Sequence, residues 1–410
     1  MQRQLTAKEA KAQAAVSRSN SALDAFEGAL SLMSDPRRAQ GKRYPLRSVV
    51  LIALMAMVCG NDDADSMADW GEDHEEWLKS FLELPHGSPS QDVLLSVFMR
   101  LDPKEFGTVF VTWVAFLRER VTELKDPHIA IDGKTSRRTY TADTPAVHTV
   151  SAWLSEAGLV IGQVKTTEKS NEITAIPELL QCLALKGTTV TIDAMGCQTA
   201  IAAAIVQQEG HYLLAVKDNQ PSLHTEIQDA FAEIDGAATR PRDLPALPKV
   251  AQHTETTKDH GRIESRKVEI IRDISRLTAE TRNRWMKLAL IVRVTRERTV
   301  ISADKSSIET TYYIGSNPKG DAEQIARFIR SHWGLENSLH YVLDVAFHED
   351  NSRHRTKNLA ANLTTLRHMA TNLLKIETTC KLGVANKRKK AGRNRDYLLR
   401  VLSGVPVEAT

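Results

Sequence analysis

The sequence has few cysteines, and their placement excludes two common kinds of stabilised scaffold. Its four cysteines, Cys59, Cys182, Cys197 and Cys380, are far apart and form no CxxC pair. A zinc ribbon or a disulfide framework needs cysteines that recur at short, paired spacings. We therefore expect neither kind of scaffold, and a reducing cytoplasm is the compartment that fits this cysteine usage.

Long apolar runs are also missing. The longest, residues 49–59, has 11 residues, whereas a helix that crosses a bilayer needs about 20. We interpret this run as a buried helix. Residues 1–16 are polar and helix-prone, and they lack the apolar stretch and cleavage site of a secretory signal. The sequence thus predicts no membrane partner and no export.

Net charge is almost absent on average, yet the charges are unevenly distributed. The 410 residues carry a formal charge of +3, and 42% of them are apolar, which is ordinary for a globular chain with a large core. Residues 353–410, however, hold 13 basic against three acidic residues, a balance of +10 that leaves −7 for the remaining 352. The basic end predicts a polyanionic partner.

Composition and periodicity divide the chain into five segments. We expect an all-α N-terminal domain that contacts DNA or protein, two halves of an α/β core separated by a partly β insertion, and a flexible basic tail. The N-terminal domain spans residues 1–120. The core consists of residues 121–219 and 316–385, the insertion between its halves spans 220–315, and the tail spans 386–410. The second half contains two long predicted helices, at about 322–347 and 356–375.

The first half of the core predicts the element order βββαβαβ. The expected strands are 128–132, 147–155, 159–166, 188–193 and 211–217, with helices at 172–185 and 198–208. Three adjacent strands followed by alternating helices and strands indicate a mixed sheet with helices packed against it. This is the order of ribonuclease H-like cores, so the predicted fold class is α/β with an inserted segment and a preceding all-α domain. Within the insertion, strand-like runs occur at 265–272, 288–295 and 310–314.

Two of the predicted strands end in an aspartate in the same phase. With a period of two, the apolar residues of each strand face one side, whereas Asp132 and Asp193 face the other. If the two strands are neighbours, both carboxylates can share a divalent cation through hard oxygen ligands. The alternative is a turn or capping role, which is common for an aspartate that closes a strand.

A third acid, Glu336, lies on the predicted helix 322–347. Its helical face is shared with the apolar residues Ile329, Trp333, Leu339 and Leu343. Burying an ionised carboxylate costs several kcal/mol unless it is paired, hydrogen-bonded or bound to metal. A metal ion would supply that partner, and an ion pair between Glu336 and His340 is the alternative. Three nearby acids are rival third ligands: Asp344, Glu349 and Asp350.

Two aspartates and a glutamate around two divalent cations form a site for phosphoryl transfer. One ion activates water or a 3′-hydroxyl, and the other stabilises the leaving oxygen, so this chemistry needs no protein nucleophile.

At these residues the sequence resembles the insertion-sequence DDE transposases, specifically the H-repeat-associated group. The strings that carry the resemblance occur in order between residues 33 and 375: DPRRAQGKRYPL, AIDGKTSRR, KSNEI, TIDAMGCQ, AVKDNQ, HGRIESR and HWGLENSLHYVLDVAFHEDNSRHR. The resemblance implies a ribonuclease H-like core interrupted after its fifth strand, and metal-binding acids at Asp132, Asp193 and Glu336. It also implies two Mg²⁺ ions, with Mn²⁺ as a substitute, and a bacterial cytoplasmic protein associated with the nucleoid.

The sequence departs from the pattern of many related transposases around the third acid. Those proteins carry an arginine four residues before the glutamate and a lysine seven after it, whereas His332 and Leu343 occupy these positions here. Arg330 and His340 are candidate replacements for the missing positive charge. A satisfied core histidine is the alternative interpretation of His340.

Other basic side chains are candidates for contacts with a phosphate backbone. These are Lys134, Arg137, Arg138, Lys217, Arg262, Arg353, Arg355 and Lys357. Ordinary surface solvation is the alternative for each of them, and a plain hairpin turn is the alternative for the His260-Gly261-Arg262 string. If several phosphates are neutralised, DNA affinity should fall steeply with salt.

Taken as a sequence, the chain predicts a DNA transposase that hydrolyses phosphodiester bonds at the ends of its element and transfers the 3′-hydroxyls to target DNA. Its partner is double-stranded DNA, on which two copies would assemble because two ends are processed together. Two alternatives stay open: a ribonuclease H-like nuclease without strand transfer, and a catalytically decayed or domesticated DNA-binding protein. The presence of all three acids argues against simple decay, and the His332 departure keeps the second alternative open.

Overall fold

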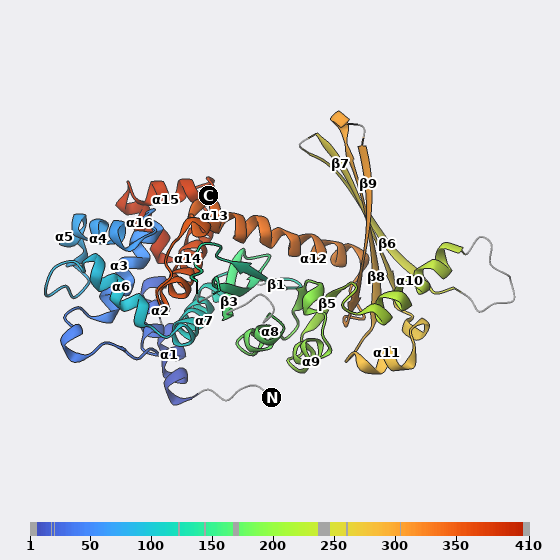
Figure 1. The fold of residues 1–410 in the computed structure, drawn as a ribbon, viewed down its shortest axis with the longest axis horizontal. Helices are drawn as coiled ribbons and strands as arrows, with labels where there is room; N and C mark the ends of the chain where they lie inside the picture. Colours follow the sequence, from blue (N-terminus) through green and yellow to red (C-terminus); the bar gives the residue numbers. More distant parts are fainter. Residues whose placement is uncertain are drawn as a thin grey trace.

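The structure, a computed structural model, has a helical body at one end, an α/β centre and a group of long strands at the other end (Figure 1). It describes residues 6–17, 19, 21–121, 124–142, 145–166, 172–236, 247–259, 261–303 and 305–404. Within this part of the chain, no helix is long and apolar enough to cross a membrane.

The N-terminal region is helical, as its periodicity predicts. Its helices are α1 (Ala7–Ser17), α2 (Ala22–Leu30), α3 (Leu46–Val58), α4 (Ala64–Asp73), α5 (Glu75–Leu78), α6 (Gln91–Arg100) and α7 (Pro103–Glu119). The apolar run 49–59 forms most of α3, whose residues from Val49 to Val58 are at most 1% exposed. A helix that is apolar on all sides must be covered on all sides, so α3 is the centre of the helical body.

One mixed sheet of nine strands runs through the rest of the molecule, in the order β3-β2-β1-β4-β5-β9-β8-β7-β6. The first five strands and their helices are β1 (His128–Thr135), β2 (His148–Leu154), β3 (Leu159–Thr166), α8 (Glu172–Gln181), β4 (Thr189–Ile192), α9 (Thr199–Gln207) and β5 (His211–Val216). The predicted order βββαβαβ and the mixed ribonuclease H-like sheet are confirmed. The strand β4 lies parallel to both β1 and β5, whereas β1, β2 and β3 are antiparallel neighbours.

The insertion continues the same sheet. It contains α10 (Pro221–Asp235), β6 (Val250–Asp259), β7 (Arg262–Ile271), α11 (Ala279–Arg284), β8 (Leu290–Val300) and β9 (Lys305–Gly315). The strand β9 pairs antiparallel with β5 and joins the inserted strands to the central five. The strands β7 and β9 extend well beyond the body of the molecule (Figure 1). Thus the insertion has four strands, one more than the sequence indicates.

The long helix predicted for 322–347 is interrupted at the third acid. It consists of α12 (Ala322–Leu335), a π-helical turn, η7 (Glu336–His340), and α13 (Tyr341–Ala346). A π-helical turn widens the helix by about one residue, and such turns are frequent at functional sites. The following helix, α14 (Leu359–Ile376), is buried among α3, α6 and α7 and ties the C-terminal half to the helical body.

The expectation of a flexible C-terminal tail is wrong for the described residues. Two helices, α15 (Val384–Ala391) and α16 (Arg395–Ser403), pack against each other and against α13 and α14. The reason is that part of the basic run is buried and satisfied. Arg388 Nε and Nη2 donate to the Met57 carbonyl at 3.0 and 2.7 Å, and Arg388 forms an ion pair with Asp62.

Candidate active site

The first two acids lie at the same level of two neighbouring parallel strands. Ile131 of β1 is paired in register with Ile192 of β4, so the residues that follow them, Asp132 and Asp193, lie side by side. The strand β4 ends before Asp193, whereas β1 continues past Asp132 to Thr135 and pairs there with β2, so the prediction that Asp132 closes its strand is wrong. Both side chains are partly accessible. The Asp193 carboxylate also caps the short 3₁₀ turn after β4, because its Oδ1 accepts hydrogen bonds from the Met195 and Gly196 amides at 3.1 and 3.3 Å. Asp193 therefore has the capping role considered above in addition to its place beside Asp132.

The glycine after the first acid is required by close packing. A Cβ atom on Gly133 would lie 2.3 Å from Glu172 Oε1 and 2.4 Å from His148 Nε2. These two buried side chains form a pair, with Nε2 2.6 Å from Oε1, and Thr135 Oγ1 lies 2.7 Å from His148 Nδ1. The glycine thus lets α8 approach β1 beside Asp132. This contact explains why the string AIDGKT and the glutamate of KSNEI occur together; residues 169–171 lie outside the described residues.

A hydrogen-bonded chain joins α12 to both acid-bearing strands. The Thr191 hydroxyl lies 2.8 Å from His128 Nε2 and 2.9 Å from His332 Nδ1, and Phe328 stacks on the His128 ring with centroids 4.9 Å apart. A hydroxyl has one hydrogen, so it donates to one imidazole and accepts from the other. Burial lowers the pKa of His128 to about 3 and that of His332 to about 4, so both rings are neutral at pH 7.

The third acid lies on the helix surface rather than in its apolar stripe. Glu336 is exposed and Trp333 is 58% exposed, which corrects the expectation that both would be buried with Ile329, Leu339 and Leu343. Leu335 is buried together with Ile329, Leu339 and Leu343, so the buried face of the helix is turned away from Trp333 and Glu336. Glu336 therefore faces solvent, directly after the helix α12 that contacts β1 and β4.

His340 is directed at the first acid. Its Nδ1 lies 3.8 Å from Asp132 Oδ2, and its Nε2 is buried with no hydrogen-bond partner. Burial, assisted by the positive charge of Lys134, lowers the pKa of His340 to about 4. The ring is therefore neutral and packs beside the carboxylate. This placement fits the alternative interpretation of His340 as a core histidine better than a contact with phosphate.

The donor chemistry of Asp132 and Asp193 fits a divalent cation. Mg²⁺ usually binds through one or two carboxylates and keeps several waters, and two carboxylates at matching positions of neighbouring parallel strands meet that need. A closed site is not preformed, because nowhere in the described part of the chain do three or more His, Cys, Asp or Glu side chains gather closely enough to hold a metal. Glu336 would have to approach from α12 to complete a three-acid site.

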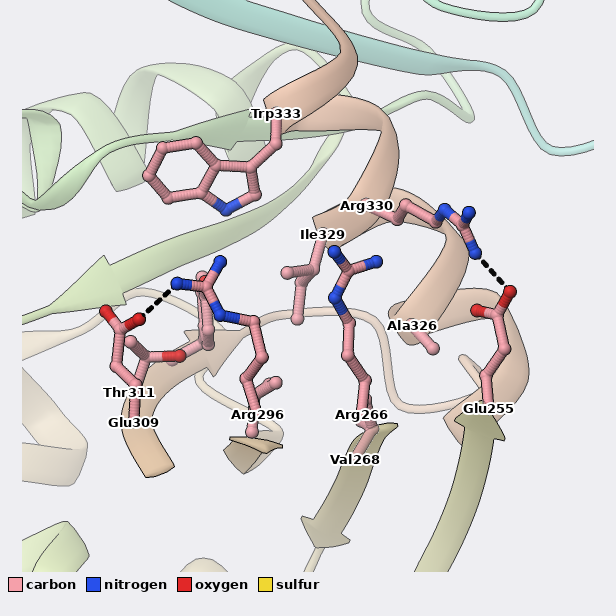
Figure 2. A pocket seen from close by; sticks show the side chains of 12 residues that line it. Glu255, Arg266, Val268, Arg296, Glu309, Thr311, Ala326, Ile329, Arg330 and Trp333 are labelled. Carbon is pink, nitrogen blue, oxygen red and sulfur yellow. Dashed lines mark hydrogen bonds and ion pairs between the residues drawn. The ribbon is translucent and has the colours of Figure 1, made fainter. Parts of the chain in front are cut away.

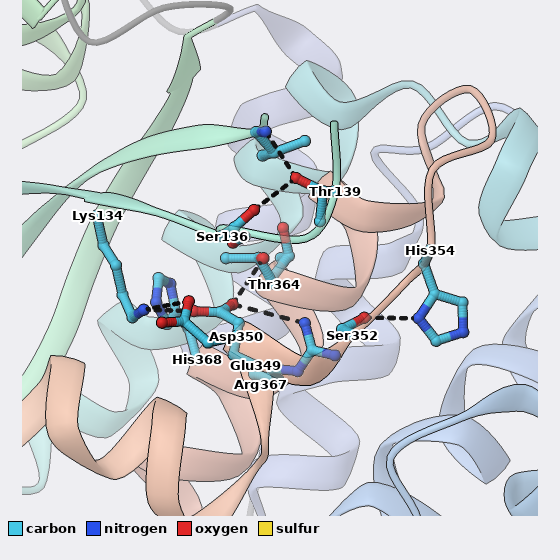
Figure 3. Close-up of polar contacts among 12 residues, drawn as sticks. Lys134, Ser136, Thr139, Glu349, Asp350, Ser352, His354, Thr364, Arg367 and His368 are labelled. Carbon is cyan, nitrogen blue, oxygen red and sulfur yellow. Dashed lines mark hydrogen bonds and ion pairs between the residues drawn. The ribbon is translucent and has the colours of Figure 1, made fainter. Parts of the chain in front are cut away.

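The three rival acids are engaged elsewhere, around Lys134, and Figure 3 shows two of them, Glu349 and Asp350, beside its ammonium. Lys134 Nζ lies 2.8 Å from Asp344 Oδ1, 3.3 Å from Asp350 Oδ1 and 3.7 Å from Glu349 Oε2. Burial alone would lower the pKa of Lys134, but Glu349, Asp344 and Asp350 together raise it. The ammonium is thus a buried internal cation, and its predicted contact with DNA does not fit this placement. The sequence shows the acids but not their partner, which is 210 residues or more away.

Comparisons with known proteins identify the family of this chain. Residues 123–373 match the family model described as "Transposase DDE domain", and residues 28–114 match the one described as "DDE_Tnp_1-associated". The chain belongs to the DDE transposases. It is 35% identical to the "H repeat-associated putative transposase YhhI" of Escherichia coli K12, over 92% of this chain and 97% of the relative. It is 36% identical to the "Putative transposase YncI" of Escherichia coli O157:H7, over 91% and 93% of the two chains.

Among solved structures, the transposase has a distant similarity to a piggyBac transposase synaptic complex with hairpin DNA. The two share 11% sequence identity with a TM-score of 0.36, and the match covers 97% of this chain and 80% of that one.

Several of the predicted basic residues of the transposase gather on two adjoining loops. The β1–β2 loop carries exposed Arg137 and Arg138, and the loop before α14 carries exposed Arg353, Arg355 and Lys357. Arg355 Nε donates to the Arg138 carbonyl at 2.9 Å and lies over the exposed Tyr140 ring, so the loops touch. Arg137 Nε lies 3.3 Å from Asp350 Oδ2. These five residues form what we call the loop cluster, which follows Asp132 and Lys134 along the chain.

The other predicted basic residues lie apart from the loop cluster. Arg330 lines a pocket between α12 and the inserted strands, together with Arg266, Arg296 and Trp333, and it forms an ion pair with Glu255 (Figure 2). Lys217 is exposed directly after β5, and Arg262 is exposed at the start of β7. His260 lies outside the described residues. The structure thus does not unite these candidates in one surface.

The buried histidines predict acid sensitivity. An unfolded histidine has a pKa of about 6.5, so between pH 6.5 and pH 4 the unfolded transposase binds protons that buried His332 excludes. The free energy of unfolding must then fall as the pH falls, by about 1.4 kcal/mol per pH unit for each such proton. His332→Gln keeps a hydrogen-bonding group for Thr191 and removes one titrating ring, so its slope should be shallower by about that amount.

Denaturant unfolding at pH 6.5, 5.5 and 4.5 measures this slope. His86→Gln, at an exposed position, is the matched control and should keep the wild-type slope. If His332→Gln kept the wild-type slope, the prediction would be wrong, because His332 would then not exclude a proton in the folded state that it binds in the unfolded state.

Proposed function

We propose that this transposase hydrolyses phosphodiester bonds at the ends of its element and joins the resulting 3′-hydroxyls to target DNA, with Asp132, Asp193 and Glu336 as its metal-binding catalytic acids. The observation that carries the proposal is the placement of Asp132 and Asp193 side by side on the parallel neighbours β1 and β4, both of which contact the helix α12 that leads into Glu336.

Each acid has a distinct part in this proposal. Asp132 and Asp193 would hold Mg²⁺, or Mn²⁺ in its place, and Glu336 would complete the site from α12. Two such ions, when bound, lower the pKa of the attacking water or hydroxyl and neutralise charge on the phosphate. The chain's own residues fix the geometry: the Thr191 hydroxyl joins α12 to β4, and Gly133 lets the Glu172 pair support β1.

The loop cluster is the proposed path of the DNA beside these acids. Arginine side chains that are exposed and close together suit a phosphate backbone, and phosphate contacts position a protein without reading sequence. The exposed Tyr140 ring beneath Arg355 adds a flat surface to the same cluster. We further propose that two copies act together on two ends, and that the protein works in the bacterial cytoplasm at the nucleoid.

A strand-transfer assay tests the proposed reaction. The wild-type transposase is incubated with Mg²⁺, a supercoiled plasmid and a labelled duplex. The duplex has the sequence of the element's terminus and is pre-cut, so that it ends in a 3′-hydroxyl. We expect labelled plasmid as product, because joining needs no energy input beyond the exchanged phosphodiester bond.

The result separates the competing functions. Cleavage of an uncut end without any joined product would favour a nuclease on the same fold. Specific binding of the end with neither cleavage nor joining, in Mg²⁺ and in Mn²⁺, would favour a decayed or domesticated DNA-binding protein.

A further inference from the structure

The C-terminal helices carry a basic hollow that the candidate active site does not use. It lies between the last turns of α15 and the start of α16 and is lined by Leu382, Asn386, Lys389, Lys390, Arg393 and Asn394. Three of the six lining residues are cations and two are amides, and none of these six described residues is acidic. Apart from the apolar Leu382, the lining of the hollow offers positive charge and hydrogen-bond donors and acceptors.

The basic end of the chain divides into a structural part and a surface part. Lys387 and Arg388 are buried, where Lys387 Nζ donates to the Leu374 carbonyl at 2.8 Å and Arg388 binds Met57 and Asp62. Lys389, Lys390 and Arg393 are instead exposed. The first pair holds α15 in place, so the remaining cations are presented on a fixed surface.

The shape of this surface suits a phosphate group. The start of α16 adjoins the hollow, but Asn394 already accepts from the Tyr397 amide at 2.8 Å and Asp396 lies in the first turn. The cations, rather than the helix N-terminus, therefore supply the attraction for an anion. Lys390 Nζ lies 4.4 Å from the Tyr397 ring centroid, and the Tyr397 hydroxyl donates to Glu377 Oε2 at 2.7 Å, which anchors the ring. The ammonium is thus held beside the hollow rather than extended freely into solvent.

We propose that this hollow binds the phosphate backbone of duplex DNA, at a site separate from the DNA being cut. The proposal rests on the proposed transposase function, which supplies DNA as the polyanion. A duplex fits better than a single strand, because single-strand sites present aromatic rings for base stacking and none of the six lining residues is aromatic. Cations that contact phosphates without reaching base edges give binding that does not depend on sequence.

The salt dependence of DNA binding tests this proposal directly. Binding of a 30-base-pair duplex of random sequence is measured for the full chain at several NaCl concentrations. The variant Lys389→Gln/Lys390→Gln/Arg393→Gln should bind about tenfold or more weakly, and the slope of log K against log salt should shrink by about 2.7, which corresponds to three lost phosphate contacts.

A matched control removes the same number of charges elsewhere. Lys104→Gln/Lys186→Gln/Lys319→Gln changes three exposed lysines and should keep the wild-type slope. Because Lys390 packs on Tyr397, the double variant Lys389→Gln/Arg393→Gln is a second test, with an expected slope change of about 1.8. Circular dichroism and the melting temperature confirm that each variant is folded.

The outcomes separate this proposal from the function on which it rests. If wild type binds duplex DNA and the hollow variants keep its affinity and slope, the hollow is not a DNA site, whereas the proposed reaction is untouched. If wild type binds no duplex at all, the transposase function fails and this proposal fails with it. If polyglutamate displaced the DNA as well as unlabelled duplex does at matched charge, the hollow would not prefer DNA to an acidic polypeptide, and the assignment to DNA would be overturned.

Discussion

Asp132→Asn, Asp193→Asn and Glu336→Gln should each abolish cleavage at the element's ends while leaving binding of those ends largely intact. The substitutions keep the shape of each side chain and remove the negative charge that a divalent cation needs. Metal ions supply several kcal/mol of charge stabilisation in the transition state, and about 4 kcal/mol corresponds to about a thousandfold in rate. We therefore expect at least that loss for each acid.

The measurement is cleavage of a labelled duplex that contains one end of the element, alongside binding of the same duplex without metal. Two exposed acids serve as controls: Asp229→Asn on α10 and Glu323→Gln in the first turn of α12. Both should cleave at the wild-type rate. Full cleavage by any one of the three site variants would remove that acid from the proposed set.

Glu336→Gln is the most informative of the three, because the structure does not bring Glu336 into a closed metal site. The rival acids Asp344, Glu349 and Asp350 surround Lys134 instead. Glu336 is exposed and lies four residues before His340, whose Nδ1 is 3.8 Å from Asp132 Oδ2. Loss of cleavage with normal end binding would indicate that α12 moves toward β1 and β4 when metal and DNA bind.

Much of the central fold is predictable because local pattern and tertiary burial agree there. The strands β1 to β5 are short, apolar and bounded by turn residues, and their predicted limits differ from the observed ones by a few residues at most. The phase of Asp132 and Asp193 follows from period-two alternation alone. To predict that these two aspartates are neighbours, the strand order is needed as well. The resemblance to a family implied that order, and the register of Ile131 with Ile192 shows it.

The outer part of the insertion was harder to predict because its strands are not covered by a core there, whereas the inner ends of β7, β8 and β9 pack against α12. No residue of β6 is fully buried, and the first part of β9 is exposed. A strand that buries neither face fully needs no apolar alternation, and the sequence VAQHTETTKD carries no such pattern. Hydrogen bonding to β7 alone defines β6 as a strand.

The details of the site could not be read from the sequence because they depend on contacts between distant residues. The exposure of Trp333 and Glu336 depends on which face of the helix packs against the rest of the protein, and the π-helical turn that begins at Glu336 breaks the periodicity that the sequence argument assumes. The Thr191 hydroxyl meets His332 across 141 residues. His332 therefore looks like a broken arginine position in sequence, yet in the structure it is a specifically bonded residue.

Lys134→Met should lower the free energy of unfolding by about 3 to 5 kcal/mol, the usual cost of breaking a buried ion pair from one side. Lys134 is 11% exposed and Glu349 is 1% exposed. Without the ammonium, three carboxylates face one another, and Glu349 keeps only the Thr364 hydroxyl at 2.9 Å and Arg367 Nη1 at 3.5 Å. Removing Lys134 should therefore cost much more than removing a surface lysine.

Denaturant unfolding measures this loss, and a double-mutant cycle assigns its cause. Asp344→Asn in the Lys134→Met background removes one of the facing charges and should recover part of the stability, so that the two changes together cost less than their sum. Lys186→Met, at a lysine that is 80% exposed, should change stability by less than about 0.5 kcal/mol. If Lys134→Met were as stable as wild type, the three acids would not need Lys134 to compensate their charge. The contact that Lys134 makes between β1 and the segment after Glu336 would then contribute nothing to the free energy of unfolding.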